Sequence, residues 1–300
     1  MNAHLGLLHG ILPATVDLKV SIPENHPSTR NLGAERVGSG TLVDPDGYIL
    51  TVHYVTLGAQ SITVTLLDGE QFPGELAAQD YESGLALVKI SGRELPFLRP
   101  APPESLSIGQ AAMIVASSGE TERRVSGGYV TSTESFDGHW EYMLDKTIRL
   151  TAFNPGYGGG TLADMRGRIM GVVSLNLNQV GKFSLAIPIE YYLRHEQELK
   201  RYGQIQSRPR RPWLGFYTQG FGGHLVVAGV VPGGPAERSG LREGDIILGV
   251  EQKEIRSRPE LYREMWKKQP GDRISFRILR EEESLNLEVA SGDRWDFYRS

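Results

Sequence analysis

The sequence has 300 residues, and its 39% hydrophobic, 23% charged and 8% aromatic side chains give an ordinary globular composition that excludes disorder. Its 32 basic and 36 acidic side chains leave a formal charge of −4, so we expect no nucleic-acid partner and no electrostatic membrane binding. The lack of cysteine excludes disulfides, thiolate metal sites and a cysteine nucleophile, while the length predicts two domains.

The first twelve residues are mildly apolar, without lysine, arginine or a small-residue cleavage site, and the sequence holds no apolar run of the ~18 residues that cross a bilayer. Two locations stay open: the cytoplasm if Met1 is the native start, and the cell envelope or periplasm if a signal was removed. His4, His9 and His26 match no compact ligand spacing, so we expect no metal site and no cofactor.

Short β-type runs bounded by turn residues fill the region from 14 to 190. The clearest runs cover residues 37–43, 48–51, 61–67, 85–90, 111–117, 169–174 and 183–187. Strands at this spacing with few helical runs between them predict β-barrels or sandwiches. The first helical pattern covers residues 188–202.

The polar, proline-containing stretch 204–212 reads as a linker. It separates a first domain, 1–203, from a second, 213–300, which has an α+β pattern. Strands are predicted at 225–231, 245–250, 274–280 and 285–289, and helices at 236–239 and from Ser257, as cap, to the residues before Pro270.

Several motifs then fall in a recognisable order. They are Gly38-Ser39-Gly40, Asp44-Pro45-Asp46-Gly47, Leu85-Ala86-Leu87, Asn154-Pro155-Gly156, Gly159-Gly160, Trp213-Leu214-Gly215-Phe216, Gly240-Leu241-Arg242-Glu243-Gly244-Asp245 and Pro270-Gly271-Asp272. Together they resemble the HtrA/Deg family of trypsin-like serine proteases. The resemblance implies a mainly β protein with a chymotrypsin-like double β-barrel followed by a small α+β PDZ domain.

The family's catalytic residues do not carry over to this sequence. Tyr54 stands at the place of the histidine, Gly84 at that of the aspartate and Gly158 at that of the nucleophilic serine. Acyl transfer on this architecture needs a hydroxyl nucleophile, an imidazole base and an orienting carboxylate. We therefore expect a pseudoenzyme with no catalytic residue.

A rescued active site is the competing hypothesis. It pairs His53 with Asp80, Glu82 or Ser83 and makes the chain a weak or unconventional endopeptidase. Adjacent residues of an extended or turn segment point in different directions, so we expect His53 to face away from the direction of Tyr54.

The glycine-rich turn around the former nucleophile permits two interpretations. Gly156 and Gly158 would present amides to an oxyanion or carboxylate, or they form the turn that the barrel needs for folding. We expect Tyr54 and Tyr157 to face the old cleft and fill it.

Peptide recognition is the chemistry that the resemblance leaves in place. Trp213, Leu214, Gly215 and Phe216 are similar to the family's carboxylate-binding loop, and the strand after them would pair with an extended peptide. On the helix opposite, either Leu261 with Met265 or Tyr262 with Trp266 lines the groove, and we favour Tyr262.

The leading hypothesis is an inactive HtrA-like scaffold that binds protein or peptide C-termini. Its partner would be a protein, including an active HtrA relative or a larger assembly. The resemblance also implies a homo-oligomer, namely a trimer. A purely structural subunit, in which the PDZ fold serves only for packing, is a third hypothesis.

Overall fold

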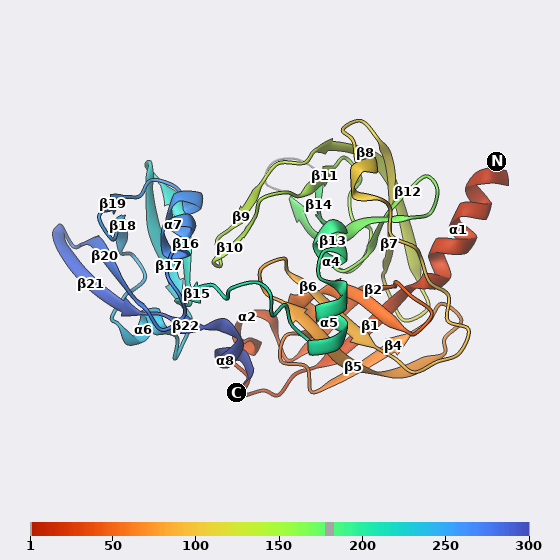
Figure 1. The fold of residues 1–300 in the computed structure, drawn as a ribbon, viewed down its shortest axis with the longest axis horizontal. Coiled ribbons are helices and arrows are strands. Elements are labelled where there is room, and N and C mark those ends of the chain that lie inside the picture. Colours follow the sequence, from red (N-terminus) through yellow and green to blue (C-terminus); the bar gives the residue numbers. More distant parts are fainter. Residues whose placement is uncertain (1, 178–182, 300) are drawn as a thin grey trace. The chain divides into compact units, whose positions relative to one another are not determined.

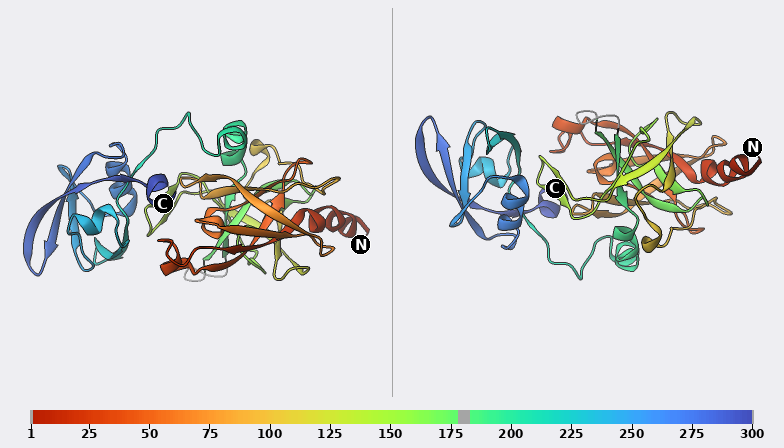
Figure 2. Two further views of the ribbon diagram at one scale, coloured as in Figure 1. Left: turned by 90° about the horizontal axis from the view of Figure 1, so that it is seen from below. Right: turned by 90° about the horizontal axis from the view of Figure 1, so that it is seen from above.

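The computed structural model describes residues 2–177 and 183–299, and these residues form two compact units. One unit is made of Met1–Ser135 and Asp145–Gln206, and the other of Phe136–Leu144 and Ser207–Ser300. Figure 1 labels their elements, and Figure 2 shows them from two further sides. The segment 136–144 thus groups with the C-terminal unit, although it lies inside the first predicted domain.

The first unit begins with a closed six-stranded antiparallel barrel in the order β1-β2-β3-β6-β5-β4. The strands are β1 (Thr15–Ser21), β2 (Glu35–Leu42), β3 (Tyr48–Val52), β4 (Ser61–Thr65), β5 (Gln71–Asp80) and β6 (Leu85–Lys89). Gly40 is needed here for packing, because a Cβ at this position would lie 2.4 Å from a methyl of Ile49.

A second closed barrel follows in the order β11-β14-β13-β12-β7-β8. Its strands are β7 (Ala111–Ser117), β8 (Arg123–Ser132), β11 (Ile148–Leu150), β12 (Thr161–Asp164), β13 (Ile169–Leu177) and β14 (Phe183–Pro188). Small and branched side chains such as Ala116, Ile148 and Val173 fill its interior. Two six-stranded barrels confirm the predicted chymotrypsin-like architecture.

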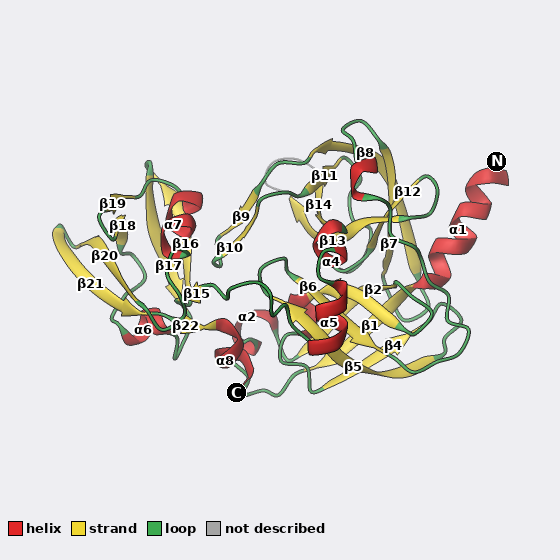
Figure 3. Cartoon of the chain, in the orientation of Figure 1, coloured by secondary structure: helices red, strands yellow, loops and turns green. Residues whose placement is uncertain are grey.

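Short helices flank these barrels (Figure 3). They are α1 (Asn2–Ala14), α2 (Thr29–Leu32), α3 (His53–Thr56), the 3₁₀ turn η1 (Pro103–Ser105), α4 (Glu190–Leu193) and α5 (Glu196–Tyr202). The predicted helix 188–202 begins later than expected, because β14 runs on to Pro188. It is also split into α4 and α5, because His195 leaves the helical conformation with φ −130°. None of the helices in the described ranges is long and apolar enough to span a membrane.

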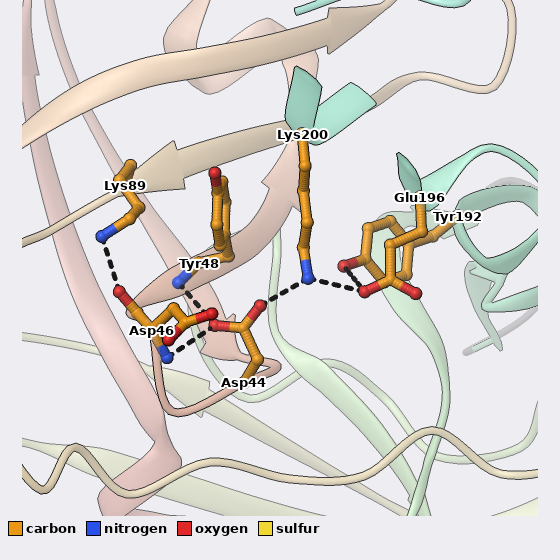
Figure 4. Close-up of polar contacts among 7 residues, drawn as sticks. All are labelled: Asp44, Asp46, Tyr48, Lys89, Tyr192, Glu196 and Lys200. Atoms are coloured by element: carbon orange, nitrogen blue, oxygen red, sulfur yellow. Dashed lines mark hydrogen bonds and ion pairs between the residues drawn. The ribbon is translucent and has the colours of Figure 1, made fainter. Parts of the chain in front are cut away.

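A partly buried network of ion pairs and hydrogen bonds connects α5 to the first barrel (Figure 4). The Lys200 ammonium lies 2.6 Å from carboxylate oxygens of both Asp44 and Glu196, and Tyr192 donates a hydrogen bond to Glu196 at 2.9 Å. Asp44 also accepts the Tyr48 amide, so one carboxylate closes the β2–β3 turn and anchors the helix.

The C-terminal unit has a sheet in the order β16-β17-β18-β20-β21, with β19 beside β18. Its strands are β15 (Pro212–Trp213), β16 (Phe216–Phe221), β17 (His224–Val230), β18 (Ile246–Val250), β19 (Lys253–Glu254), β20 (Arg273–Arg280), β21 (Glu283–Ala290) and β22 (Gly292–Asp293), and its helices are α6 (Pro235–Arg238), α7 (Arg258–Met265) and α8 (Arg294–Arg299). Ser257 caps α7 as predicted, since its side chain accepts the Glu260 amide.

The segment that joins this unit from the middle of the chain is a hairpin. It consists of β9 (Phe136–Gly138) paired with β10 (Tyr142–Leu144), and Met143 belongs to the same apolar core as Phe216 and Phe276. Nothing in the sequence pattern predicts this pairing.

Candidate functional site

The three positions that correspond to the family's triad lie next to strand ends of the two barrels, two in the first barrel and one in the second. Tyr54 is in α3, directly after β3, and Gly84 is in the β5–β6 turn, where its carbonyl accepts the His53 amide at 2.8 Å. Gly158 precedes β12, and its carbonyl accepts the Ser39 amide at 2.7 Å. The segments therefore meet as the family resemblance implies, but with different side chains.

Tyr54 fills the space beside Gly158. Its phenol donates a hydrogen bond of 2.7 Å to the Ser174 carbonyl, and a Cβ at Gly158 would lie only 2.0 Å from the Tyr54 oxygen. Burial raises the pKa of Tyr54 to about 12, against the opposing effect of the hydrogen bond to Ser174. The group at the histidine position is therefore a neutral, hydrogen-bonded phenol.

At position 84 the backbone conformation itself favours glycine. Gly84 has φ +81°, a left-handed conformation that residues other than glycine rarely adopt. The local backbone is thus shaped for glycine, and its amide donates to the Asp80 carbonyl at 2.8 Å.

His53 is a buried side chain packed beside the β5–β6 turn. The side chain is 9% exposed, its Nδ1 lies 3.3 Å from the Gly84 carbonyl, and its ring meets that of Tyr81 edge-on at 5.8 Å. Ser83, one hydroxyl of the rescue hypothesis, is buried, and its Oγ accepts the Leu85 amide.

Two amides of the glycine turn donate to groups of the protein. The Gly156 amide donates to the Asn154 side chain at 3.3 Å, and the Tyr157 amide donates to the Ser117 carbonyl at 2.8 Å. A Cβ at Gly156 would lie 2.2 Å from that same carbonyl, so close backbone approach requires glycine there. These contacts support the structural interpretation of the turn, and its role as an anion site stays a prediction.

The candidate carboxylate-binding loop has the geometry expected for its residues. Gly215 has φ +80°, and its carbonyl accepts the Val231 amide, while a Cβ there would lie 2.8 Å from the Trp213 ring. The amides of Leu214, Gly215 and Phe216 point at one carboxylate. That carboxylate belongs to Glu141 of the hairpin.

Glu141 is the site residue that sequence reasoning missed. Only 4% of it is exposed, and burial raises the pKa of its carboxyl, opposed by the Arg294 charge and by the three amides. Its φ of +53° is unusual for a residue with a side chain. The sequence carries no signal for it, because the contact joins residues more than 70 positions apart.

Helix α7 buries residues of both stripes, since Leu261, Tyr262 and Met265 are fully buried in the same apolar core. The Tyr262 hydroxyl also donates to the Gly138 carbonyl at 2.6 Å and accepts the Glu141 amide at 3.1 Å. Tyr262 is therefore on the side of α7 that faces the hairpin. Its role in peptide binding remains a prediction.

Metal binding finds no support within the described ranges, where acidic and histidine side chains form no group of three or more able to hold an ion. Of the histidines considered, His26 is buried, and its Nδ1 lies 2.7 Å from the Ser28 hydroxyl. His26 is therefore a buried residue whose ring nitrogen contacts a neighbouring hydroxyl.

Comparisons with known proteins agree with this geometry. Residues 38–172 match the trypsin-like peptidase domain and residues 211–290 match the PDZ domain. The probable periplasmic serine endoprotease DegP-like of Ectopseudomonas mendocina is 29% identical over an alignment of 292 positions, which covers 91% of this chain and 60% of that protein. The protein of the same description from Hahella chejuensis is 30% identical over an alignment of 274 positions, which covers 86% of this chain and 57% of that protein.

The chain thus spans about three fifths of the length of these curated relatives. A solved structure, the HtrA-type protease AlgW with tripeptide, is 26% identical, covers 97% of both chains and superposes with a TM-score of 0.60. Two barrels, a PDZ sheet with its glycine loop and these matches lead to one assignment: the chain belongs to the HtrA family of trypsin-like serine proteases.

Proposed function

We propose that this HtrA-family chain does not cleave peptides and instead binds protein or peptide C-termini through its PDZ domain. The observation that carries the first half is the Tyr54 phenol, which lies where a side chain at position 158 would begin. A glycine supplies no nucleophile, and a phenol whose pKa is raised to about 12 accepts no proton at neutral pH. Both reacting groups of acyl transfer are therefore replaced.

Binding is supported by the loop Trp213–Phe216. Three successive amides converge on one carboxylate there, which is how PDZ domains bind a peptide C-terminus. The PDZ match and the peptide named with the related AlgW structure support the same ligand class. We predict that Trp213, Leu214, Gly215 and Phe216 form the carboxylate end of the groove, with Tyr262 on its wall.

The catalytic half is tested by exposing the chain to a fluorophosphonate label and to casein, beside an active HtrA-type protease as positive control. We expect neither labelling nor degradation. Stoichiometric labelling that disappears in His53→Ala would contradict the proposal and favour the unconventional endopeptidase. His53→Ala is the informative variant, because His53 is the imidazole nearest to the Tyr54 position in sequence.

The binding half is tested with C-terminal peptides and their amidated twins. Amidation removes the charge that the three amides recognise, so we expect it to abolish binding. This comparison is preferable to changing Gly215, whose φ of +80° makes any substitution strained. If no peptide is captured by any form of the chain, the purely structural hypothesis is favoured.

The relatives named as periplasmic favour the envelope over the cytoplasm as the place of action. Cell fractionation of the native producer would test this proposal. A homo-oligomer, and specifically a trimer, is the assembly that we propose from family membership. Sedimentation analysis showing a stable monomer at micromolar concentration would contradict it.

A further inference from the structure

The carboxylate-binding loop is occupied by the chain itself. One Glu141 oxygen accepts the Leu214 amide at 3.0 Å, and the other accepts the amides of Gly215 and Phe216 at 2.6 and 3.1 Å. These are the amides proposed above for a peptide's terminal carboxylate. A buried charge with three donors is well satisfied, so the loop has no amide left for a second carboxylate in this state.

The main chain next to Glu141 also imitates a bound peptide. The Thr218 amide on β16 donates to the His139 carbonyl at 3.0 Å, two residues before Glu141. On the opposite side, the Tyr262 hydroxyl of α7 donates to the Gly138 carbonyl. Residues 138–141 therefore lie between β16 and α7, which is where an extended ligand adds to a PDZ sheet.

Polar contacts at the edges hold this segment. Arg258 pairs with Asp137 at 2.7 Å, and Arg294 donates to the carbonyls of Trp140 and Glu141 at 3.3 and 3.1 Å. The positive φ of Glu141 is a strained conformation that persists only while such contacts hold it. These polar contacts around Glu141 are ones that water or a ligand can replace, whereas Met143 of the same hairpin is anchored in the apolar core.

We propose that the 136–144 hairpin is an internal ligand of the PDZ groove, with the Glu141 carboxylate in the place of a peptide C-terminus. An external C-terminal peptide then binds only after the hairpin leaves the groove. This inference rests on the proposed peptide-binding function. The apparent dissociation constant equals the intrinsic one divided by the open fraction, so the hairpin weakens binding by the reciprocal of the fraction of molecules in which it has left the groove.

The experiment uses the full chain and one probe, a fluorescein-labelled heptapeptide Ser-Phe-Asp-Gly-His-Trp-Val. It repeats residues 135–140 and ends in a valine whose main-chain carboxylate replaces the Glu141 side chain. Fluorescence anisotropy compares the original chain with Glu141→Ala and with the control Glu281→Ala. Glu281 is an exposed glutamate of the same unit that also has positive φ, at +47°.

We expect Glu141→Ala to bind the probe at least about tenfold more tightly, Glu281→Ala to bind like the original chain, and the amidated probe not to bind. Amide hydrogen exchange at residues 214–216 should accelerate in Glu141→Ala alone. If Glu141→Ala folds poorly, Asp137→Asn provides the second variant. It removes the ion pair with Arg258 but leaves the amides untouched, and we expect a severalfold gain.

Each contrary outcome is distinct. Equal probe binding by the original chain and Glu141→Ala, or unchanged exchange at residues 214–216, overturns the internal-ligand proposal and leaves peptide binding intact. Accelerated exchange without any probe binding overturns the peptide-binding function itself, and the internal ligand becomes a packing contact.

Discussion

Two places where an HtrA-family protein would meet a peptide are both filled by this chain's own side chains, but in different ways. In the barrel unit, Tyr54 extends from a helix packed on β2 and β3 and hydrogen-bonds to the Ser174 carbonyl. In the PDZ unit, Glu141 sits on a hairpin, and its bonds to three amides are ones that a peptide terminus can reproduce.

The two places differ in whether an external peptide could replace the side chain that fills them. Removing Tyr54 from its place would still leave Gly84 and Gly158, which carry no side chain, beside it. Removing Glu141 would expose a complete set of amide donors. Under the proposed function, emptying the first place therefore restores no catalysis, while emptying the second restores binding.

The largest expected effect comes from adding a side chain beside Tyr54. In Gly158→Ala the new Cβ would overlap the phenol oxygen, so we expect the free energy of unfolding to fall by about 1–3 kcal/mol. Gly127→Ala is the control, because a Cβ at Gly127 meets nothing within 4 Å. Urea unfolding of both variants measures the difference.

The same substitution in a Tyr54→Ala background completes a double-mutant cycle. If the phenol is the obstacle, most of the Gly158→Ala penalty should vanish there. A penalty that is the same in both backgrounds would show that Tyr54 does not occupy this space.

A smaller effect is expected when only the Tyr54 hydroxyl is removed. Tyr54→Phe keeps the ring but leaves the Ser174 carbonyl without this donor, which should lower the free energy of unfolding by about 1 kcal/mol. Chemical denaturation measures the change. An unchanged or higher stability would mean that the phenol's hydrogen bond is dispensable for filling the cleft.

The smallest effect is confined to alkaline solution. The pKa of Tyr54 is raised from 10.0 to about 12 in the fold, so the folded state holds this proton more tightly than the unfolded state does. The resulting stability is fully present below pH 10 and is lost as the pH rises through the folded pKa. The stability difference between the original chain and Tyr54→Phe should therefore shrink between pH 10 and about 12. A constant difference would contradict the raised pKa.

The sequence was sufficient for the features that depend on local pattern or on motif order. It predicted the two barrels, the PDZ unit and the Ser257 cap, while the loss of the reacting groups at positions 54, 84 and 158 stays a prediction. It did not predict how the cleft is closed at atomic level, since the approach of Tyr54 to Gly158 joins residues about 100 positions apart.

The 136–144 hairpin could not be predicted from the sequence either, because its contacts also join residues that are distant in the chain. Its two three-residue strands are too short to show a strand period, and the residues that they contact in the PDZ unit lie in another part of the chain. The apolar N-terminal segment forms the helix α1. Its side chains gave no clear amphipathic stripe from which to predict this.

The hairpin also changes what a dissected gene product would report. Cutting the chain within 204–212 yields a fragment, 213–300, that resembles a complete PDZ domain by every motif but lacks the strand pair 136–144. If the hairpin is an internal ligand, we expect such a fragment to have an unoccupied carboxylate loop and to bind peptides more tightly than the intact chain. Peptide screens with this fragment would then measure the intrinsic affinity of the groove, without the competition from the 136–144 hairpin.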